Sequence, residues 1–438
     1  MNKGKNLTEG NISKILISLA IPIVGASFLQ MTYGLVDMIW IGRIGSGAVA
    51  AIGTATFFLN LGEALNSIVV MGGGIKASHS IGAKQNKELE EYINSSFFIN
   101  LIISLAFIIF LFLLKNNLIN FFNLGNLAIE KDAKIYLQIV GVGLFFKFAN
   151  ILYMRLLNSF GETKLPFKIS CVGVILNIIL DPILIFGFNL GVAGAAIATL
   201  ISQAIITFMF IKISKRFFIV DNIFKIYSKK ISEIISLGTP IGIQRVLFTG
   251  IGIIIGKIIA DFGPDAIAAQ KIGLQIESIS YMTVGGLYGA VASFIGQNYG
   301  AQKFDRIKKG YKLAVLLSVI LGTITTILFT VFPKFLVEIF VKDLKTVEIG
   351  INYLRIVGIS QIFMCAEIVT NGSFNGIGVP KTPSIISVVF TSLRIPLAYF
   401  LGSIYGINGI WMTISITMFL RGTISPTLFI INLKKLIK

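Results

Sequence analysis

Oxygen-bearing side chains interrupt long apolar stretches in the N-terminal half of the sequence. Asp37 ends one such stretch, Asn177 and Asp181 stand four residues apart in another, and Thr199 lies in the next. On a helix, an i, i+4 spacing places both side chains on one face. Two carboxylates, an amide and a hydroxyl are the hard ligands that suit a sodium ion or a proton. These residues are a candidate cation site. The alternative is that Asp37 and Asp181 only cap or bridge helices.

Two prolines accompany these acids. Pro22 lies about four helical turns before Asp37, and Tyr33 lies one turn before it on the same face. Pro182 directly follows Asp181 and frees a backbone carbonyl group near that carboxylate. A helix that carries Pro22 can bend or shift there, so cation binding near Asp37 has a place at which to change the chain.

A second polar set lies in the C-terminal half. Gln275, Glu277, Glu367 and Arg394 interrupt apolar stretches there, with Lys257 nearby. Ionisable groups at membrane depth are candidates for a functional role, here the lining of a substrate cavity. An equally good alternative is a buried ion pair of Glu277 or Glu367 with Arg394 or Lys257 that stabilises this half.

Composition defines the class of protein that must position these groups. The chain has 438 residues, of which 55% are apolar and 13% charged, with a net charge of +18. Such a composition excludes a water-soluble enzyme, and it favours basic loops facing an anionic membrane leaflet over nucleic-acid binding. The two cysteines lie in apolar runs and form no disulfide framework. We find no Walker motif and no Ser-His-Asp set, and therefore expect no resident cofactor.

Apolar stretches long enough to cross a membrane recur throughout the chain. They predict an all-α integral membrane protein with twelve transmembrane helices, at residues 15–40, 48–72, 94–114, 133–157, 168–187, 191–213, 234–260, 266–291, 311–332, 349–371, 384–404 and 409–431. Lys and Arg concentrate in alternate loops on the side of the N-terminus. We therefore expect a multi-pass protein of the cell membrane, with both termini cytoplasmic.

The sequence repeats itself internally. At an offset of about 218, residues 17–23 match residues 235–241, and at an offset of 217 the Asn-x-x-Gly-x-x-Lys-x-Pro segment at Asn158 matches that at Asn375. Six helices, an even number, separate the copies. The copies therefore have the same orientation and form two parallel six-helix bundles related by an axis along the membrane normal.

The repeat divides the chain into an N-terminal lobe at residues 1–216, a cytoplasmic linker at 217–233 and a C-terminal lobe at 234–438. Parallel lobes joined in this way suit alternating access around a cleft between them. In the repeat, Asp37 and Asp181 fall on apolar residues. A purely structural need should recur in both halves, which favours the functional interpretation of the two acids.

One glycine run has a superficial likeness to a phosphate loop. Gly72-Gly73-Gly74 precedes Lys76 and Ser78, but the Gly-Lys-Ser/Thr ending is missing. We expect these glycines to permit close packing of helices.

Taken together, the sequence resembles the multidrug and toxic compound extrusion (MATE) transporters over essentially the whole chain. The likeness rests on Pro22, Tyr33 and Asp37, on the Asn177/Asp181 pair, and on the stretches Gly-Leu-Val-Asp-Met at 34–38 and Ile-Gly-Gln-Asn-Tyr-Gly-Ala at 295–301. The resemblance implies export of small-molecule drugs or toxic organic compounds, often cationic, driven by inward flow of H⁺ or Na⁺. We expect a monomer in contact with membrane lipids, with no nucleic-acid partner.

The resemblance also implies roles for particular residues. It places the cation site of the N-terminal lobe at Asp37, Asn177, Asp181 and Thr199. It matches a further set to positions linked to rearrangement of that site: Pro22, Tyr33, Tyr136 and Asn150.

The chain departs from the vibrio-type sodium-coupled branch of the family. That branch has a carboxylate in the seventh helix, where this sequence reads Val-Leu-Phe-Thr at 246–249. It looks closer to the DinF-like branch, which puts a cation site in the second lobe in doubt. Two rival functions remain open, a lipid-linked oligosaccharide flippase of the same superfamily and a membrane-embedded enzyme.

Overall fold

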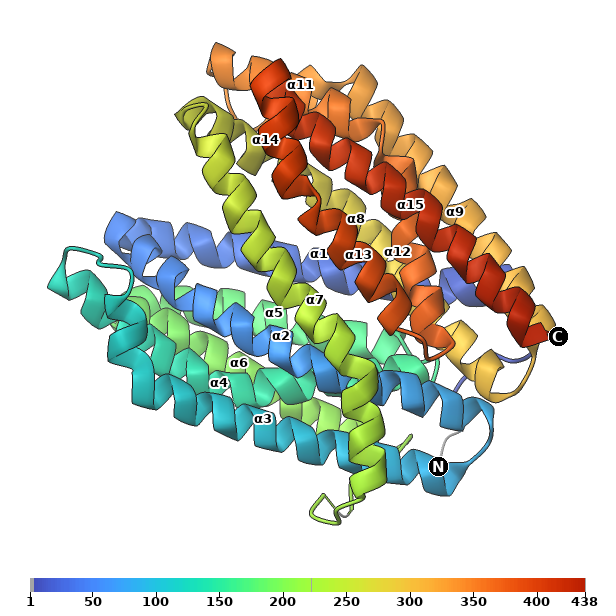
Figure 1. Ribbon diagram of the computed structural model, residues 1–438. Helices are drawn as coiled ribbons and strands as arrows, with labels where there is room; N and C mark the ends of the chain where they lie inside the picture. The colour runs from blue at the N-terminus through green and yellow to red at the C-terminus, as the bar shows by residue number, and fades with distance from the viewer. Residues whose placement is uncertain (1–3, 222, 438) are drawn as a thin grey trace. The chain divides into compact units, whose positions relative to one another are not determined.

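The computed structural model describes residues 4–221 and 223–437 (Figure 1). Over these residues the chain is helical, with no strand. Eleven helices are long and apolar enough to cross a membrane, or twelve if one bent pair counts as a single span. The prediction of an all-α integral membrane fold is confirmed.

Two helices, α1 (Ile12–Ile44) and α7 (Ser228–Ala260), are shared between two compact units. Unit 1 comprises Met1–Asn6 and Gly25–Gly242, and unit 2 comprises Leu7–Val24 and Ile243–Lys438. Each helix changes units two residues after its proline, Pro22 or Pro240. The lobes predicted as contiguous segments therefore differ from the compact units, because each unit takes the first part of its neighbour's leading helix.

Unit 1 is built around α4. Its elements are α2 (Ser46–Gly82), α3 (Asn86–Asn120), α4 (Leu127–Ser159), α5 (Lys164–Pro182), η1 (Ile183–Gly187) and α6 (Gly191–Ser214), with the adjoining parts of α1 and α7. Helix α4 packs against α2, α3 and α6 (Figure 1). Pro182 cannot donate its own helical hydrogen bond, and the chain continues after it as the π-helical turn η1.

Unit 2 is built around α12. Its elements are α8 (Pro264–Gly300), α9 (Phe304–Val331), α10 (Pro333–Glu338), α11 (Leu344–Gly358), α12 (Gln361–Gly376), α13 (Lys381–Ser392), α14 (Arg394–Tyr405) and α15 (Ile407–Ile437), with the adjoining parts of α1 and α7. Helix α12 packs against α8, α9 and α15.

Two of the predicted spans are broken in unit 2. The tenth is the pair α11 and α12, bent by 54° where the Thr326 hydroxyl donates a 2.8 Å hydrogen bond to the Gly358 carbonyl. The eleventh is divided at Leu393 into α13 and α14. Ser360 lies in the first break, and Arg394 directly follows the second.

The repeated loops adopt the same turn in both units. Gly161 and Gly378 have φ angles of +73° and +78°, a conformation that glycine adopts without steric cost. Their amides donate to the carbonyl groups of Asn158 and Asn375, at 3.0 and 3.1 Å. The Asn-x-x-Gly motif is thus a helix C-terminal turn that ends α4 and α12.

Glycines allow the backbones of α2 and the first part of α7 to pack closely within unit 1. A Cβ atom on Gly72 would lie 2.0 Å from the Ile234 carbonyl oxygen, and one on Gly238 would lie 1.8 Å from that of Ile68. On Gly73, a Cβ would meet the Ser96 hydroxyl at 2.4 Å. The expectation that the glycine run serves helix packing is confirmed.

Within unit 2, side chains of residues 295–301 bind the segment that precedes α1, at residues 7–10. The Gln297 side chain accepts a 3.0 Å hydrogen bond from the Leu7 amide, and Asn298 donates to the Leu7 carbonyl at 3.1 Å. Arg306 also donates to the Gly10 carbonyl at 3.1 Å. In this chain the motif therefore serves docking of that segment.

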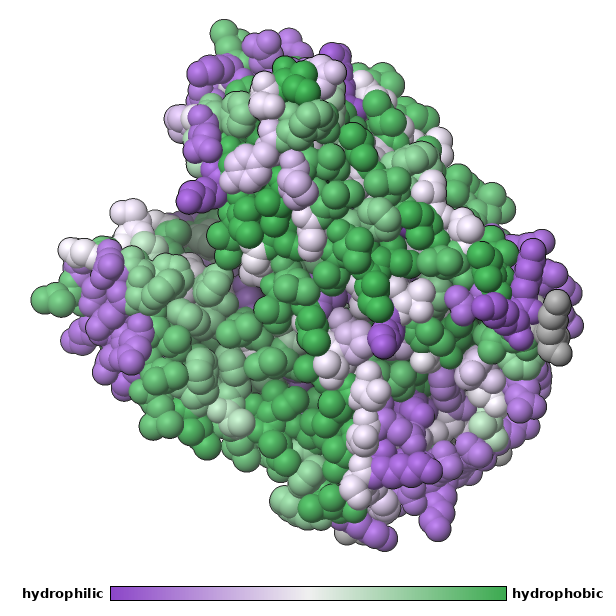
Figure 2. Space-filling view, viewed as in Figure 1, coloured by the Kyte–Doolittle hydropathy of each residue, from purple (hydrophilic) through white to green (hydrophobic). Residues whose placement is uncertain are grey.

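The outward-facing helix surfaces are mainly apolar along their length. Figure 2 shows hydrophobic side chains over the middle of the helices and hydrophilic ones gathered near helix ends and loops. Many large apolar side chains are exposed, including Ile109, Leu113 and Phe208. This distribution suits burial in the hydrocarbon core of a membrane.

Candidate functional site

Three helices of unit 1 bring the predicted cation ligands together. Asp37 and Tyr33 come from α1, Asn177 and Asp181 from α5, and Thr199 from α6. The Tyr33 and Thr199 hydroxyl groups share a 3.1 Å hydrogen bond that joins α1 to α6. The Asn177 amide donates to Asp181 Oδ1 at 3.4 Å within α5, as the i, i+4 spacing predicts.

The two carboxylates keep one unsatisfied oxygen each. Asp37 Oδ1 and Asp181 Oδ2 are buried and accept no hydrogen bond. Asp181 itself is fully buried, with 0% of its surface exposed. The two groups are close enough for their charges to interact. Buried carboxylate oxygens without donors are costly, and a bound cation or proton removes that cost.

Tyr136 completes this cluster from α4. Its side chain is buried and lies within electrostatic range of Asp37, Tyr33 and Asp181. A phenol hydroxyl is a hydrogen-bond donor, so Tyr136 adds a donor near the two carboxylates. Tyr136 was singled out only by family resemblance, and nothing in its spacing could have placed it there.

The donor set of the cluster suits a monovalent cation. Over the described part of the chain, no three His, Cys, Asp or Glu side chains gather as for a transition metal. Two carboxylates with hydroxyl and amide oxygens are instead hard ligands for Na⁺, and the same carboxylates accept H⁺.

Asn150 has a different setting. Its amide group donates to the Gln203 carbonyl at 3.0 Å and to Gln203 Oε1 at 2.9 Å, and its oxygen accepts from the Thr207 hydroxyl at 2.8 Å. Asn150 thus bridges α4 and α6 with its polar atoms occupied. Pro22, the remaining residue of the predicted set, lies on the part of α1 that belongs to unit 2.

An ion pair that the sequence analysis did not single out also lies in unit 1. Lys147 of α4 contacts Glu63 of α2, and both side chains are 29% exposed. Each residue interrupts a predicted apolar span, which was the available signal. Because the two charges compensate each other, we assign the pair to the α2–α4 interface.

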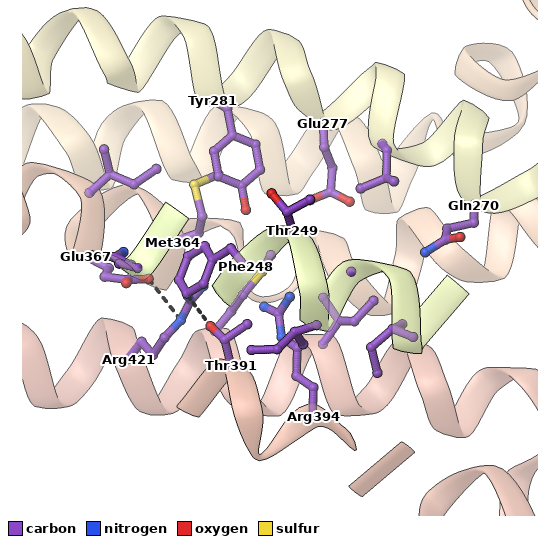
Figure 3. A pocket seen from close by; sticks show the side chains of 18 of the residues that line it. Phe248, Thr249, Gln270, Glu277, Tyr281, Met364, Glu367, Thr391, Arg394 and Arg421 are labelled. Atoms are coloured by element: carbon purple, nitrogen blue, oxygen red, sulfur yellow. Dashed lines mark hydrogen bonds and ion pairs between the residues drawn. The ribbon is translucent and has the colours of Figure 1, made fainter. Parts of the chain in front are cut away.

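Unit 2 contains a cavity of about 790 Å³ (Figure 3). Glu277, Glu367 and Arg394 line it, as predicted for a substrate cavity, but Gln275 does not. Gln275 precedes Glu277 by two residues, and the helical rotation of about 200° turns it to another face of α8. Gln244 and Gln270 provide amide groups to the lining instead.

One acid of this cavity is held in a buried ion pair. Arg421 Nε of α15 lies 3.3 Å from Glu367 Oε2 of α12, with the side chains 7% and 4% exposed. This contact is an ion pair and not a hydrogen bond, since Nε has no hydrogen-bond partner. The alternative that predicted a buried pair was right in kind but named Arg394 or Lys257 as the partner. Arg421 was missed, although it interrupts the last apolar span.

The other acid is satisfied by neutral donors. Glu277 Oε1 accepts a hydrogen bond from the Tyr353 hydroxyl, and Oε2 accepts from Gln361 Nε2 at 3.5 Å. Tyr353 is fully buried and stacks edge-on against Trp411. Glu277 therefore joins α8 to α11 and α12.

Known proteins are similar to this chain in sequence and in fold. A probable multidrug resistance protein NorM from Thermotoga maritima is 27% identical over 434 residues, covering 96% of this chain and 92% of that protein. A probable multidrug resistance protein YpnP from Bacillus subtilis is 26% identical, covering 95% and 94%. A solved MOP superfamily transporter from Pyrococcus furiosus has a TM-score of 0.92 at 21% identity, covering 100% and 99%.

A bundle of membrane-spanning helices in two units, each with buried ionisable groups, is typical of multi-span membrane transporters. The MatE family model matches residues 22–183 and 240–400, two segments that begin at Pro22 and Pro240. The chain belongs to the MatE family. Members of this family are transporters and not enzymes, so the rival hypothesis of a membrane-embedded enzyme is wrong.

Proposed function

We propose that this chain is a multidrug efflux transporter that exports organic, often cationic, compounds in exchange for H⁺ or Na⁺. The observation that carries the proposal is the pair of unsatisfied carboxylate oxygens of Asp37 and Asp181 in unit 1. The related proteins named for multidrug resistance support the substrate class.

Helix α1 provides the physical link in this proposal. It is one continuous helix from Ile12 to Ile44, and it passes from unit 2 to unit 1 between Val24 and Gly25. Pro22 lacks the amide that would bond to Ser18, so the helix is weakest two residues before this passage. A cation that draws Asp37 toward Asp181 acts on a helix whose other end is packed in unit 2.

Coupling requires that the cation bind two access states differently. A shift from 1:99 to 99:1 needs roughly 5.5 kcal/mol of differential binding. Neutralising two buried like-charged carboxylates is a source of energy of this size, since each is penalised by desolvation and by its neighbour. In the state with the acids apart, the same cation has only one carboxylate ligand.

The flippase alternative has less support. A flippase of this kind is expected to have more than twelve membrane-spanning helices and a strongly cationic central cavity. The described residues provide eleven spans, or twelve if the bent pair is counted as one. The cavity of unit 2 combines its basic residues with Glu277 and Glu367. The pyrophosphate group of a lipid-linked oligosaccharide carries several negative charges, and it favours a larger excess of basic residues than Lys271, Arg394 and Arg421 provide here.

Cation-coupled export can be tested by measuring ethidium transport in proteoliposomes, with a pH gradient and a sodium gradient imposed separately. We expect Asp37→Asn to reduce transport under both gradients to the level of protein-free liposomes, because an amide accepts no proton at neutral pH and offers Na⁺ no negative charge. Ethidium binding and the thermal unfolding midpoint should remain at the wild-type values. Whichever gradient drives the wild type identifies the coupling ion.

Asp132→Asn is the matched control. Asp132 lies on α4 in the same unit and forms no hydrogen bond or ion pair through its side chain with the described residues, so the variant should transport like the wild type. Wild-type transport by Asp37→Asn under both gradients would refute the coupling role of this site.

A further inference from the structure

The cavity of unit 2 contains a cation whose charge has no partner. Arg394 stands at the start of α14, where the eleventh span is broken, and lines the cavity. Its Nε donates a 2.8 Å hydrogen bond to the Thr417 hydroxyl of α15. Its Nη2 atom is buried and has no hydrogen-bond partner. Among the described residues, no carboxylate lies within 4.0 Å of this guanidinium group.

The nearby charges do not satisfy Arg394. Glu277 is close enough to attract it, but the Glu277 oxygens accept hydrogen bonds from Tyr353 and Gln361. Glu367 is paired with Arg421, whose positive charge also repels Arg394. Arg394 is therefore a cation of this cavity without an ion-pair partner in contact, and Lys271, whose side chain is exposed, adds a second positive charge to the lining.

Arg421 is already fixed by its surroundings. Besides its contact with Glu367, its Nη1 donates to the Thr391 hydroxyl at 3.0 Å, and its Cζ lies 5.9 Å from the centre of the Phe248 ring. Figure 3 shows Arg421 held by these contacts at one end of the cavity and Arg394 extending into it. Arg421 positions the wall of the cavity, while Arg394 has free donors.

An unpaired guanidinium group in a membrane-embedded unit is costly unless a ligand compensates it. The planar fork of donors on arginine matches the two oxygens of a carboxylate. The rest of the lining supplies flat or flexible apolar groups, among them Phe248, Tyr281, Met364 and Met418. A volume of about 790 Å³ is in the range that encloses a drug-sized molecule.

We propose that the unit 2 cavity binds the carboxylate of anionic or zwitterionic aromatic compounds, with Arg394 as the residue that contacts the carboxylate. This inference rests on the proposed export function and assigns one residue of this cavity to recognition of a negatively charged group. The aromatic body of the compound lies against Phe248 and the methionines, and its charge replaces the missing partner of Arg394.

Binding of 2-naphthoate to the full chain in nanodiscs, measured by calorimetry, tests this site. The neutral analogue 2-naphthamide has the same shape without the charge. We expect the wild type to prefer naphthoate, and Arg394→Gln to weaken naphthoate binding by roughly 10- to 100-fold, the range for a lost hydrogen bond to a charged group. Naphthamide binding should be the same in both proteins.

Two further variants separate recognition from folding. Arg394→Lys retains the charge but loses the fork of donors, so its affinity for naphthoate should lie between those of the wild type and Arg394→Gln. Arg355→Gln removes an exposed arginine from α11 in the same unit and should bind naphthoate like the wild type. Thermal midpoints identify any variant that is not folded.

The outcomes for this site and for the export function are independent. If Arg394→Gln binds naphthoate as tightly as the wild type does, the carboxylate site is refuted, whatever the ethidium experiment shows. If naphthoate binding depends on Arg394 while ethidium is not transported by the wild type, the site stands and the proposed export function fails.

Discussion

The ion pair between Glu367 and Arg421 makes a quantitative prediction about the stability of unit 2. Both side chains are nearly inaccessible, and Glu367 Oε1 also accepts a 3.0 Å hydrogen bond from the Ser387 hydroxyl. Removing one member leaves the other charge buried without its partner. Loss of one partner of a buried pair costs about 3–5 kcal/mol.

We therefore expect Arg421→Met and Glu367→Gln each to lower the unfolding midpoint in detergent by roughly 6–20 °C, at about 2–4 °C per kcal/mol. The double variant leaves no unpaired charge, so its loss should be smaller than that of either single variant. Unfolding can be followed with a thiol-reactive dye, because Cys365 is only 1% exposed in the folded chain.

The exposed pair of Lys334 and Glu338 on α10 is the matched control. Its atoms lie 3.7 Å apart with side chains 72% and 37% exposed, and removing one member should cost below about 1 kcal/mol. Strictly additive losses in the Glu367/Arg421 cycle, or single variants as stable as the control, would refute the assignment of this pair as a stabilising contact.

Two further predictions concern packing and a helix cap. Gly238→Ala should lower the unfolding midpoint, because its Cβ would lie 1.8 Å from the Ile68 carbonyl oxygen and overpacking costs about 1–3 kcal/mol. Gly250→Ala on the same helix is the control, since its Cβ would meet nothing within 4 Å and the variant should be neutral or stabilised. Equal midpoints for the two variants would contradict this packing. Asp343 caps α11 by accepting hydrogen bonds from the Thr346 amide and hydroxyl, both 2.9 Å long, and these bonds hold the pKa of its carboxyl below the usual value. Because the native pKa is lowered, the carboxylate stabilises the fold above its ordinary pKa and loses this effect as the pH falls through the native one. Asp343→Ala should therefore have a lower midpoint at pH 7 and converge on the wild type in acid, and a difference that persists at low pH would refute a role for the charge.

Much of the fold could be predicted because apolar length directly reports membrane-spanning helices. The break between α11 and α12 could not, since the apolar run continues through Gly358 without a proline. A broken span depends on which neighbour satisfies the freed carbonyl group, here the Thr326 hydroxyl. That contact joins residues 32 positions apart, and hydropathy does not encode it.

The candidate sites divide in the same way. Asn177 and Asp181 could be paired from the sequence because four residues separate them on one helix. The partner of Glu367 could not be chosen between arginines, because that choice depends on the rotation of α14 and α15 about their axes. The prediction that Gln275 lines the cavity was wrong for the same reason, because the rotation of α8 about its axis determines which of its residues face the cavity.

The passage of α1 and α7 from one unit to the other bears on how this architecture arose. Neither half of the duplicated sequence contains all the helices of a complete unit, because Leu7–Val24, at the start of the N-terminal copy, belongs to unit 2, and the start of α7, up to Gly242, belongs to unit 1. A single ancestral copy with the same arrangement would have had to exchange its leading segment with that of a second molecule. Fusion of two such copies would place both exchanged segments in one chain, as in a domain-swapped dimer whose subunits are covalently joined.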